Sequence, residues 1–262
     1  MSGTDFSALS HLECSRTGAI CDADTVQGTS SVGAPFLARY DLERVAATVT
    51  LAEVAGRAPN LWRYHELLPV HAEHNIVCLG EGMTPLLELP TYGAQLGVPD
   101  LRMKDEGLLP SGTFKARGAA VGVSRAAELG VKGIAMPTNG NAGAAWSLYA
   151  ARAGLRSLIA MPMHAPEITQ AECVVAGAEL YFVDGLIGEA GALIAAAVAE
   201  REDQEPRLGD GRCPGLASGR AACLSCFACS LILDSWALLV ERYSAPCARS
   251  SRCRSTSDCR SP

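Results

Sequence analysis

The stretch GIAMPTNGNAGAAWSLYAARAGLRSLIAMPM, residues 133–163, decides the fold class of this chain. It opens on a short apolar run and passes through a polar loop into a segment with helical spacing, which Gly154 ends before a second apolar run. Short apolar runs are typical of strands buried on both faces, and glycine is a common helix stop. The stretch therefore predicts a strand, a helix and a second strand joined as a βαβ unit.

The same alternation of strand and helix patterns continues on both sides of this stretch. The predicted segments are a helix over Lys115–Leu129, strands over Gly133–Thr138 and Leu155–Met163, helices over Asn141–Ala153 and Pro166–Ala176, a strand at ELYFVDG (179–185) and a helix over Gly188–Arg201. This order predicts an α/β fold with a parallel sheet and right-handed crossovers. Ligands of such sheets lie outside the carboxyl ends of the strands, so we expect the loop Thr138–Asn141 at a functional edge.

The first part of the chain has a less regular pattern. Apolar spacing predicts helices over Ala38–Val49 and around Trp62–Leu68. The segment GEGMTPLLELP (Gly80–Pro90) reads as a glycine-rich turn that leads into an apolar strand. Taken alone, its Thr84-Pro85 step is compatible with an ordinary turn.

Composition excludes several classes of protein. The 262 residues are 48% hydrophobic and 19% charged, which is typical of a globular chain and not of disorder or a coiled coil. The net charge of −6 gives no basic footprint for nucleic acid. The N-terminus shows no basic region followed by an apolar one, and the apolar run Ala221–Val240 contains an acid, cysteines and serines, so we expect a cytoplasmic protein without a membrane span.

The composition changes near Glu202. Arginine, serine and cysteine make up 25 of the 60 residues from 203 to 262, and strand–helix alternation stops. Reading a GC-rich message in another frame gives this composition. We therefore divide the chain into an enzyme-like region, residues 1–202, and a divergent tail, residues 203–262, and interpret the tail as the product of a frameshift or truncation.

Metal binding is not expected. Cys223, Cys226 and Cys229 have C-x-x-C spacing but lie in an apolar run without a nearby histidine, so small apolar packing residues are the favoured interpretation over a zinc or iron–sulfur site. For His71 and His74 a solvated face is favoured over a metal pair. The neighbours Asp105 and Glu106 resemble paired acid–base carboxylates, but adjacent side chains point in different directions.

The segment KDEGLLPSGTFKARG (104–118) places Lys115 at the start of a helix. The positive end of the helix dipole is unfavourable for an ordinary solvated cation, whereas it suits an amine that forms an imine with a cofactor aldehyde. A surface lysine is the alternative. Lys104 and Lys132 are the other two lysines of the chain.

The segment PTNGNAGAAW (137–146) forms a polar strand-to-helix loop. The N–H groups at the following helix start can bind an anion such as a carboxylate. Asn141 could cap this helix, or its amide could donate to a phenolate oxygen.

Together these segments resemble the fold-type II pyridoxal-phosphate enzymes, the class with the tryptophan synthase β-like fold, and among them most closely the threonine synthases. The resemblance runs from about Leu12 to Glu200 and includes LECSRTGAICDADTVQG, ARYDL, GEGMTPL, KDEGLLPSGTFKARG and TNGNAG. The combination of GEGMTPL, KDEG and FKARG is the more particular to threonine synthases.

The resemblance implies pyridoxal 5'-phosphate as cofactor and Lys115 as the residue that forms the internal aldimine. It implies that Asn141 hydrogen-bonds the ring oxygen of the cofactor. The loop Thr138, Asn139, Gly140, Asn141 and Ala142 would receive the substrate α-carboxylate. The implied enzyme is a lyase that converts O-phospho-L-homoserine and water to L-threonine and phosphate, the last step of threonine biosynthesis. The resemblance is also compatible with a homodimer.

Two departures from the family pattern leave other functions open. Cys14 is followed by Ser15, Arg16 and Thr17, so the early cysteine pair is absent. The glycine loop for the cofactor phosphate is absent as well, because the tail offers only Gly209, Gly211, Gly215 and Gly219, and so the second lobe is incomplete. The alternatives are a catalytically inactive fragment and another fold-type II enzyme, either a serine/threonine dehydratase or a cysteine synthase.

Overall fold

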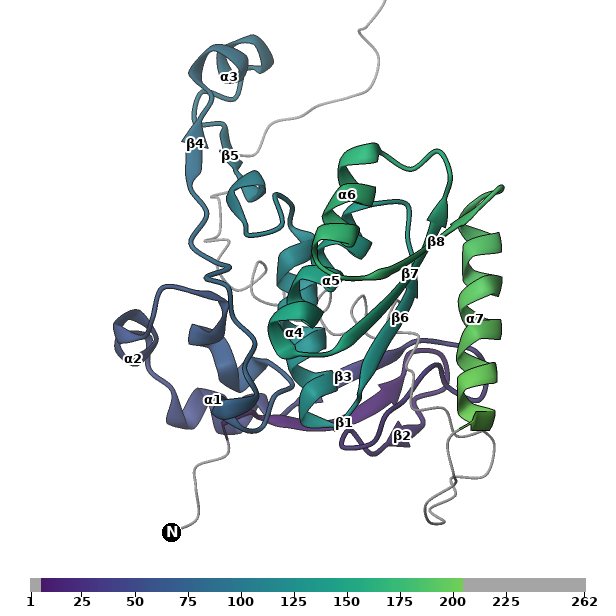
Figure 1. Ribbon diagram of the computed structural model, residues 1–262. Coiled ribbons are helices and arrows are strands. Elements are labelled where there is room, and N and C mark those ends of the chain that lie inside the picture. The colour runs from purple at the N-terminus through teal and green to yellow at the C-terminus, as the bar shows by residue number, and fades with distance from the viewer. Residues whose placement is uncertain (1–5, 205–262) are drawn as a thin grey trace, which may run out of the picture.

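The computed structural model describes residues 6–204 (Figure 1). A parallel sheet of three strands, β6 (Gly133–Pro137), β7 (Arg156–Pro162) and β8 (Glu179–Val183), forms its centre in the order β6-β7-β8. The central strand, β7, is apolar and buried on both faces, and it pairs with a parallel neighbour on each side. The α/β fold predicted from residues 133–163 is confirmed.

Helices cover both faces of this sheet. α4 (Lys115–Glu128), α5 (Asn141–Ala153) and α6 (Glu167–Val175) lie on one side, and α7 (Ile187–Gln204) lies on the other (Figure 1). Tyr149, Ile159 and Met161 are fully buried between these layers. α5 ends at Gly154, whose φ of 70° is the left-handed conformation that favours glycine.

A second, antiparallel sheet is built by the N-terminal residues. Its strands are β1 (Leu9–Cys14), β2 (Ile20–Cys21) and β3 (Phe36–Tyr40), in the order β2-β1-β3. The helices α1 (Leu42–Thr48) and α2 (Leu51–Gly56) follow, and the 3₁₀ helices η1 (Leu61–Leu67) and η2 (Glu73–Asn75) come after them.

One helix prediction in this region was wrong in its first residues. The expected helix over Ala38–Val49 begins only at Leu42, because Phe36–Tyr40 pairs with β1 as strand β3. Across that pair, Arg39 donates two hydrogen bonds to Glu13. Tertiary pairing therefore overrides the local helical spacing.

A hairpin arm projects from the body. Its elements are β4 (Leu86–Glu88), α3 (Pro90–Leu96) and β5 (Arg102–Lys104), and the short 3₁₀ helix η3 (Glu106–Leu108) leads back toward α4 (Figure 1). The predicted strand after the turn is present as β4, but it is short and not buried. β4 has three residues, and all three are exposed.

No helix within residues 6–204 is long and apolar enough to cross a membrane. The same residues contain no cluster of histidine, cysteine or acidic side chains fit for a metal ion. The imidazole ring of His71 lies against the carboxylate of Asp24, with 3.1 Å between Nε2 and Oδ1. The predictions for Ala221–Val240, for the cysteines of the tail and for its glycines lie outside the described residues.

Candidate active site at the carboxyl edge of the sheet

The loop after β6 is organised by the hydroxyl group of Thr138. The Thr138 N–H continues the sheet ladder by donating to the carbonyl of Ala160 at 2.9 Å. Its buried Oγ1 then accepts hydrogen bonds from the N–H groups of Gly140 and Gly143, both at 3.1 Å. Thr138 thus binds one of the free N–H groups at the start of α5, as a capping side chain would.

Two glycines make this tight loop sterically possible. Gly140 has a φ of 146°, and a Cβ there would lie 3.0 Å from Oγ1 of Thr169. A Cβ at Gly143 would lie 2.6 Å from Cγ2 of Thr138. Larger residues at either position would push the loop away from the sheet edge.

Asn141 is the first residue of α5 and not its cap. The N-cap position belongs to Gly140, and the side chain of Asn141 is exposed. Within residues 6–204, that side chain makes no hydrogen bond. The capping interpretation of Asn141 was therefore wrong, and its amide is available to a ligand. Of the other loop members, Asn139 is exposed and Ala142 is half-buried.

The three lysines of the chain have three different environments. Lys104 donates from Nζ to the carbonyl of Thr84. Lys132 is exposed and directly precedes β6, which places it at the amino edge of the sheet. Lys115 is half-buried at the start of α4, with its Nζ 4.4 Å from the centre of the Phe114 ring, and no carboxylate of the described residues lies within ion-pair distance of it.

Packing between α4 and α5 brings Lys115 and Asn141 to the same edge. Gly122 of α4 lies directly under the indole ring of Trp146 in α5, so closely that a Cβ would collide with the ring. Gly122 follows Lys115 by seven residues and Trp146 follows Asn141 by five. Since both helices run back from the carboxyl edge, their first residues are level to within about 3 Å of helix rise.

Next to Lys115, three separate segments meet in one cluster, the Glu106 clasp, made of Thr84, Glu106 and Arg117. Arg117 donates to both carboxylate oxygens of Glu106, at 2.6 and 2.8 Å. Thr84 donates from Oγ1 to the same carboxylate at 2.6 Å. The hydrogen bonds from Arg117 are the main reason that the pKa of Glu106 falls to about 2.

Asp105 takes a different role from its neighbour. Its Oδ1 accepts from the N–H of Gly107 and so caps η3. The expectation that Asp105 and Glu106 do not share a site is confirmed. Sequence reasoning missed, however, that Glu106 binds Arg117, because the two residues lie on separate elements 11 positions apart.

A second buried carboxylate holds the turn before the arm. Glu81 is fully buried and accepts hydrogen bonds from the Trp62 Nε1–H at 3.0 Å and the Tyr149 hydroxyl at 2.7 Å. Burial and the adjacent carboxylate raise the pKa of Tyr149. Gly82 is required next to it, because a Cβ would lie 2.7 Å from the backbone of Asn60. The GEGMTP segment is therefore a structural junction between η1 and α5, which the sequence did not reveal.

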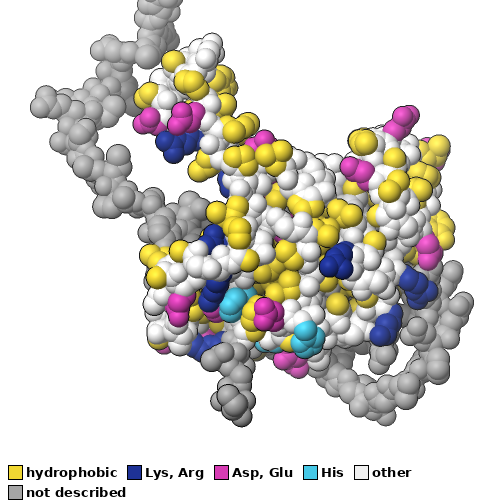
Figure 2. Space-filling model, turned by 60° about the vertical axis from the view of Figure 1, so that its left-hand side comes forward, with side chains coloured by type: hydrophobic (Ala, Val, Ile, Leu, Met, Phe, Trp, Pro, Cys, Tyr) yellow, Lys and Arg dark blue, Asp and Glu magenta, His cyan; other side chains and the backbone are white. Residues whose placement is uncertain are grey.

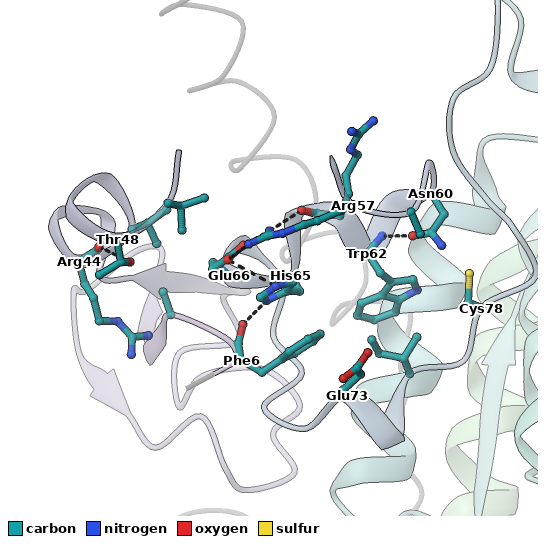
Figure 3. A pocket seen from close by; sticks show the side chains of 16 residues that line it. Phe6, Arg44, Thr48, Arg57, Asn60, Trp62, His65, Glu66, Glu73 and Cys78 are labelled. Atoms are coloured by element: carbon teal, nitrogen blue, oxygen red, sulfur yellow. Dashed lines mark hydrogen bonds and ion pairs between the residues drawn. The ribbon is translucent and has the colours of Figure 1, made fainter. Parts of the chain in front are cut away.

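A cavity of about 930 Å³ lies elsewhere, among α1, α2, η1 and η2 (Figure 3). Two of its polar groups are already engaged: Arg57 donates to both oxygens of Glu66, and the His65 ring contacts the carbonyl of Phe6. Neither Lys115 nor the loop Thr138–Ala142 lines it. The candidate site is thus the sheet edge and not this cavity.

The fold and the edge site define an α/β protein in which Lys115 begins α4 and Asn141 begins α5 at the same edge of a parallel sheet. Residues 77–212 match the family described as "Pyridoxal-phosphate dependent enzyme". The chain belongs to this family, and membership implies pyridoxal 5'-phosphate as the cofactor.

Several curated proteins that the chain resembles are named threonine synthases. The chain is 38% identical to the threonine synthase of Methanocaldococcus jannaschii over 149 residues, which are 57% of this chain and 37% of that protein. It is 33% identical to the threonine synthase of Methanosarcina acetivorans over 186 residues, 70% of this chain and 45% of that protein. The chain thus spans less than half the length of either relative.

A solved structure gives a weaker match. Diaminopropionate ammonia lyase from Escherichia coli is 19% identical, with a TM-score of 0.46 over 64% of this chain and 50% of that chain.

The described residues fit the aldehyde and ring portions of pyridoxal phosphate. Lys115 offers an amine and Asn141 offers an amide at the same edge of the sheet. Within residues 6–204, the amine forms no ion pair and the amide does not cap the helix. The first turns of α4 and α5 also carry no capping side chain at their N-cap positions, Phe114 and Gly140.

Proposed function

We propose that residues 1–202 form the cofactor-anchoring region of a threonine synthase. In this proposal Lys115 binds the aldehyde carbon of pyridoxal phosphate covalently through Nζ, and the Asn141 amide donates to the ring oxygen. The position of Lys115 carries the proposal, because Lys104 is tied to Thr84 and Lys132 lies at the opposite edge of the sheet.

The proposed reaction takes O-phospho-L-homoserine and water to L-threonine and phosphate. When bound, the cofactor supplies an electron sink for the substrate carbons. The Lys115 amine would move protons at Cα and Cβ of the substrate. The loop Thr138–Ala142 would orient the α-carboxylate, with Asn139 and Asn141 as its exposed polar members.

The loop is suited to this task by its rigidity. The Thr138 hydroxyl group accepts hydrogen bonds from the backbone N–H groups of Gly140 and Gly143. We therefore assign Thr138 to shaping the loop and not to contacting the substrate. Gly140 and Gly143 let the backbone pack tightly against Thr169 and Thr138, which holds the loop in place. Thr138→Val is therefore expected to loosen the loop, and with it the orientation of the substrate.

Product analysis tests the proposed reaction against its rivals within the fold class. Purified chain with pyridoxal phosphate is given O-phospho-L-homoserine, L-serine, or an O-activated serine together with sulfide, and threonine, phosphate, ammonia and cysteine are quantified. Threonine and phosphate in equal amounts support the proposal. Ammonia from serine would replace it with a dehydratase, and cysteine formed from an activated serine and sulfide would replace it with a cysteine synthase.

An inactive fragment is the second candidate, and a specific observation favours it. The chain covers 37% and 45% of the two threonine synthases, and its tail offers no glycine loop to surround the phosphate of the cofactor. This second candidate predicts weak cofactor binding and negligible phosphate release from O-phospho-L-homoserine by the 262-residue chain.

Two measurements separate that candidate from an active enzyme. Replacing residues 203–262 with the corresponding lobe of a threonine synthase is expected to restore cofactor binding and turnover, whereas robust turnover by the 262-residue chain would contradict the inactive candidate. Sequencing the gene around the codons for residues 200–207 tests the frameshift, since a family-like continuation should appear in another frame.

A further inference from the structure

We infer that Glu106 is a positioning residue for Lys115: it holds Arg117 and thereby fixes the rotation of the first turn of α4. The inference rests on the proposed function of Lys115 as the attachment point of the cofactor. It begins from the way this helix starts. α4 has Phe114 at its N-cap and no capping hydrogen bond from a side chain, whereas α1 and α2 are capped by Asp41 and Thr50.

An uncapped first turn needs another restraint. The preceding loop supplies little, since Gly112 has a φ of 65° and is exposed, and Phe114 is 57% exposed. Ala116 of this turn is buried in the core, and the strong polar contacts of the turn are those of Arg117, whose guanidinium group makes a two-point contact with the Glu106 carboxylate. Such a fork fixes direction as well as distance.

Helix geometry converts this contact into a direction for Lys115. Residues two apart in an α-helix are separated by about 200° around the axis, so Lys115 and Arg117 point to opposite sides. If Arg117 is held toward the arm by Glu106, Lys115 is turned away from it. A rotation of the first turn would move the Lys115 amine while leaving the rest of the helix in place.

The Glu106 clasp also joins the segments that frame the edge. Thr84 lies in the turn before β4, Glu106 lies after β5, and Arg117 lies on α4. The side chains of Arg117 and Glu106 are 13% and 25% exposed, so water competes little for their hydrogen bonds. The clasp therefore joins both ends of the arm to the helix that carries the lysine.

The same helix contains a matched control. Near its other end, Glu128 binds Arg125 and also accepts from the N–H of His71 and the N–H of Ala72. Glu128→Gln removes a buried arginine partner from α4 far from Lys115. A purely structural role for Glu106 would make Glu106→Gln and Glu128→Gln equivalent.

The experiment measures where pyridoxal phosphate attaches in the 262-residue chain. Wild type, Glu106→Gln and Glu128→Gln are incubated with excess cofactor, reduced with borohydride and digested, and the ratio of label on Lys115 to label on Lys132 is measured by mass spectrometry from pH 6 to pH 9. Lys132 serves as an internal reference for general amine reactivity. Arg117→Lys, which keeps the charge but loses the fork, serves as a second variant if Glu106→Gln fails to fold.

We expect the Lys115-to-Lys132 ratio to fall about tenfold in Glu106→Gln and to stay at the wild-type value in Glu128→Gln. Arg117→Lys should give an intermediate ratio. Equal ratios in Glu106→Gln and Glu128→Gln, with wild type strongly labelled on Lys115, would overturn the positioning role alone. A wild-type ratio near or below one would instead contradict the proposed function of Lys115.

Discussion

The body and the arm of this molecule differ in what their side chains meet. In the body, formed by β6–β8 with α4–α7, residues such as Tyr149, Ile159 and Met161 have no solvent contact. In the arm, formed by β4, α3 and β5, all six strand residues are exposed. No layer formed by residues 6–204 covers the apolar side chains of the arm (Figure 2); those at least 39% exposed are Leu86, Leu87, Tyr92, Leu96, Val98 and Met103.

This difference separates local from tertiary causes of structure. The arm has good local signals: Pro90 begins α3, and Gly97 ends it with a φ of 70°. Those signals define its elements but bury little apolar surface, and an isolated two-stranded hairpin is only marginally stable in water. The body has both the local signals and the burial.

The largest expected difference between body and arm is in amide hydrogen exchange. The amides of β7, paired on both sides, should exchange at least about a thousand times more slowly than those of β4 and β5. Exchange measured by mass spectrometry on peptides from residues 156–162 and 86–104 checks this. Similar protection of the two regions would show that the arm is covered.

Substitutions should show the same contrast in the free energy of unfolding. Trp146 is 3% exposed and packs on Gly122, so Trp146→Ala should cost about 3–5 kcal/mol. Tyr92 is 55% exposed, so Tyr92→Ala should change stability by less than about 0.5 kcal/mol. Urea unfolding followed by circular dichroism measures both. A large loss in Tyr92→Ala would break the contrast.

A smaller effect is expected at the edge of the body. Asn141→Ala removes the amide proposed to donate to the ring oxygen of the cofactor, and a hydrogen bond to a charged group contributes about 1.5–3 kcal/mol. Affinity for pyridoxal phosphate, measured by absorbance titration, should therefore fall about tenfold or more. Because Asn141 is exposed and does not cap α5, the free energy of unfolding should not change. Unchanged affinity would remove Asn141 from the proposed site.

The Glu106 clasp is expected to make the stability of the body depend on pH. The pKa of Glu106 in the folded chain is about 2, below its ordinary value of 4.5, so the clasp stabilises fully above pH 4.5 and loses its contribution as the pH falls toward 2. The stability difference between wild type and Glu106→Gln should shrink over that range. Urea midpoints of the two proteins at pH 6 and pH 3 measure it. A difference that is constant with pH would contradict an ionised clasp.

The sequence predicted the body well because its patterns are local and regular. The helix Asn141–Ala153 matches in both bounds, and the strands β6 and β7 fall within the predicted runs. Lys115 begins a helix as expected. The parallel alternation of strands and helices then fixes which ends meet, so the edge location of Lys115 and the loop Thr138–Ala142 follows from chain order.

The parts that sequence reasoning missed depend on contacts between distant segments. The wrong helix start before Leu42 arises because β1 pairs with residues 36–40. The bonds of Glu106 to Arg117 and of Glu81 to Tyr149 join residues 11 and 68 positions apart. Asn141 was a candidate cap, but the hydroxyl group of Thr138 binds the N–H of Gly143 instead. No local pattern specifies such partners.

The central claim is that the edge of the body, and not the arm or the amino edge, carries the reactive lysine. Reduction of the 262-residue chain with borohydride at high pyridoxal phosphate concentration, followed by peptide mapping, tests it directly. The account predicts label on Lys115, loss of that label in Lys115→Ala, and little label on Lys104 or Lys132. Label mainly on Lys104 in the arm, or on Lys132 at the amino edge, would contradict it.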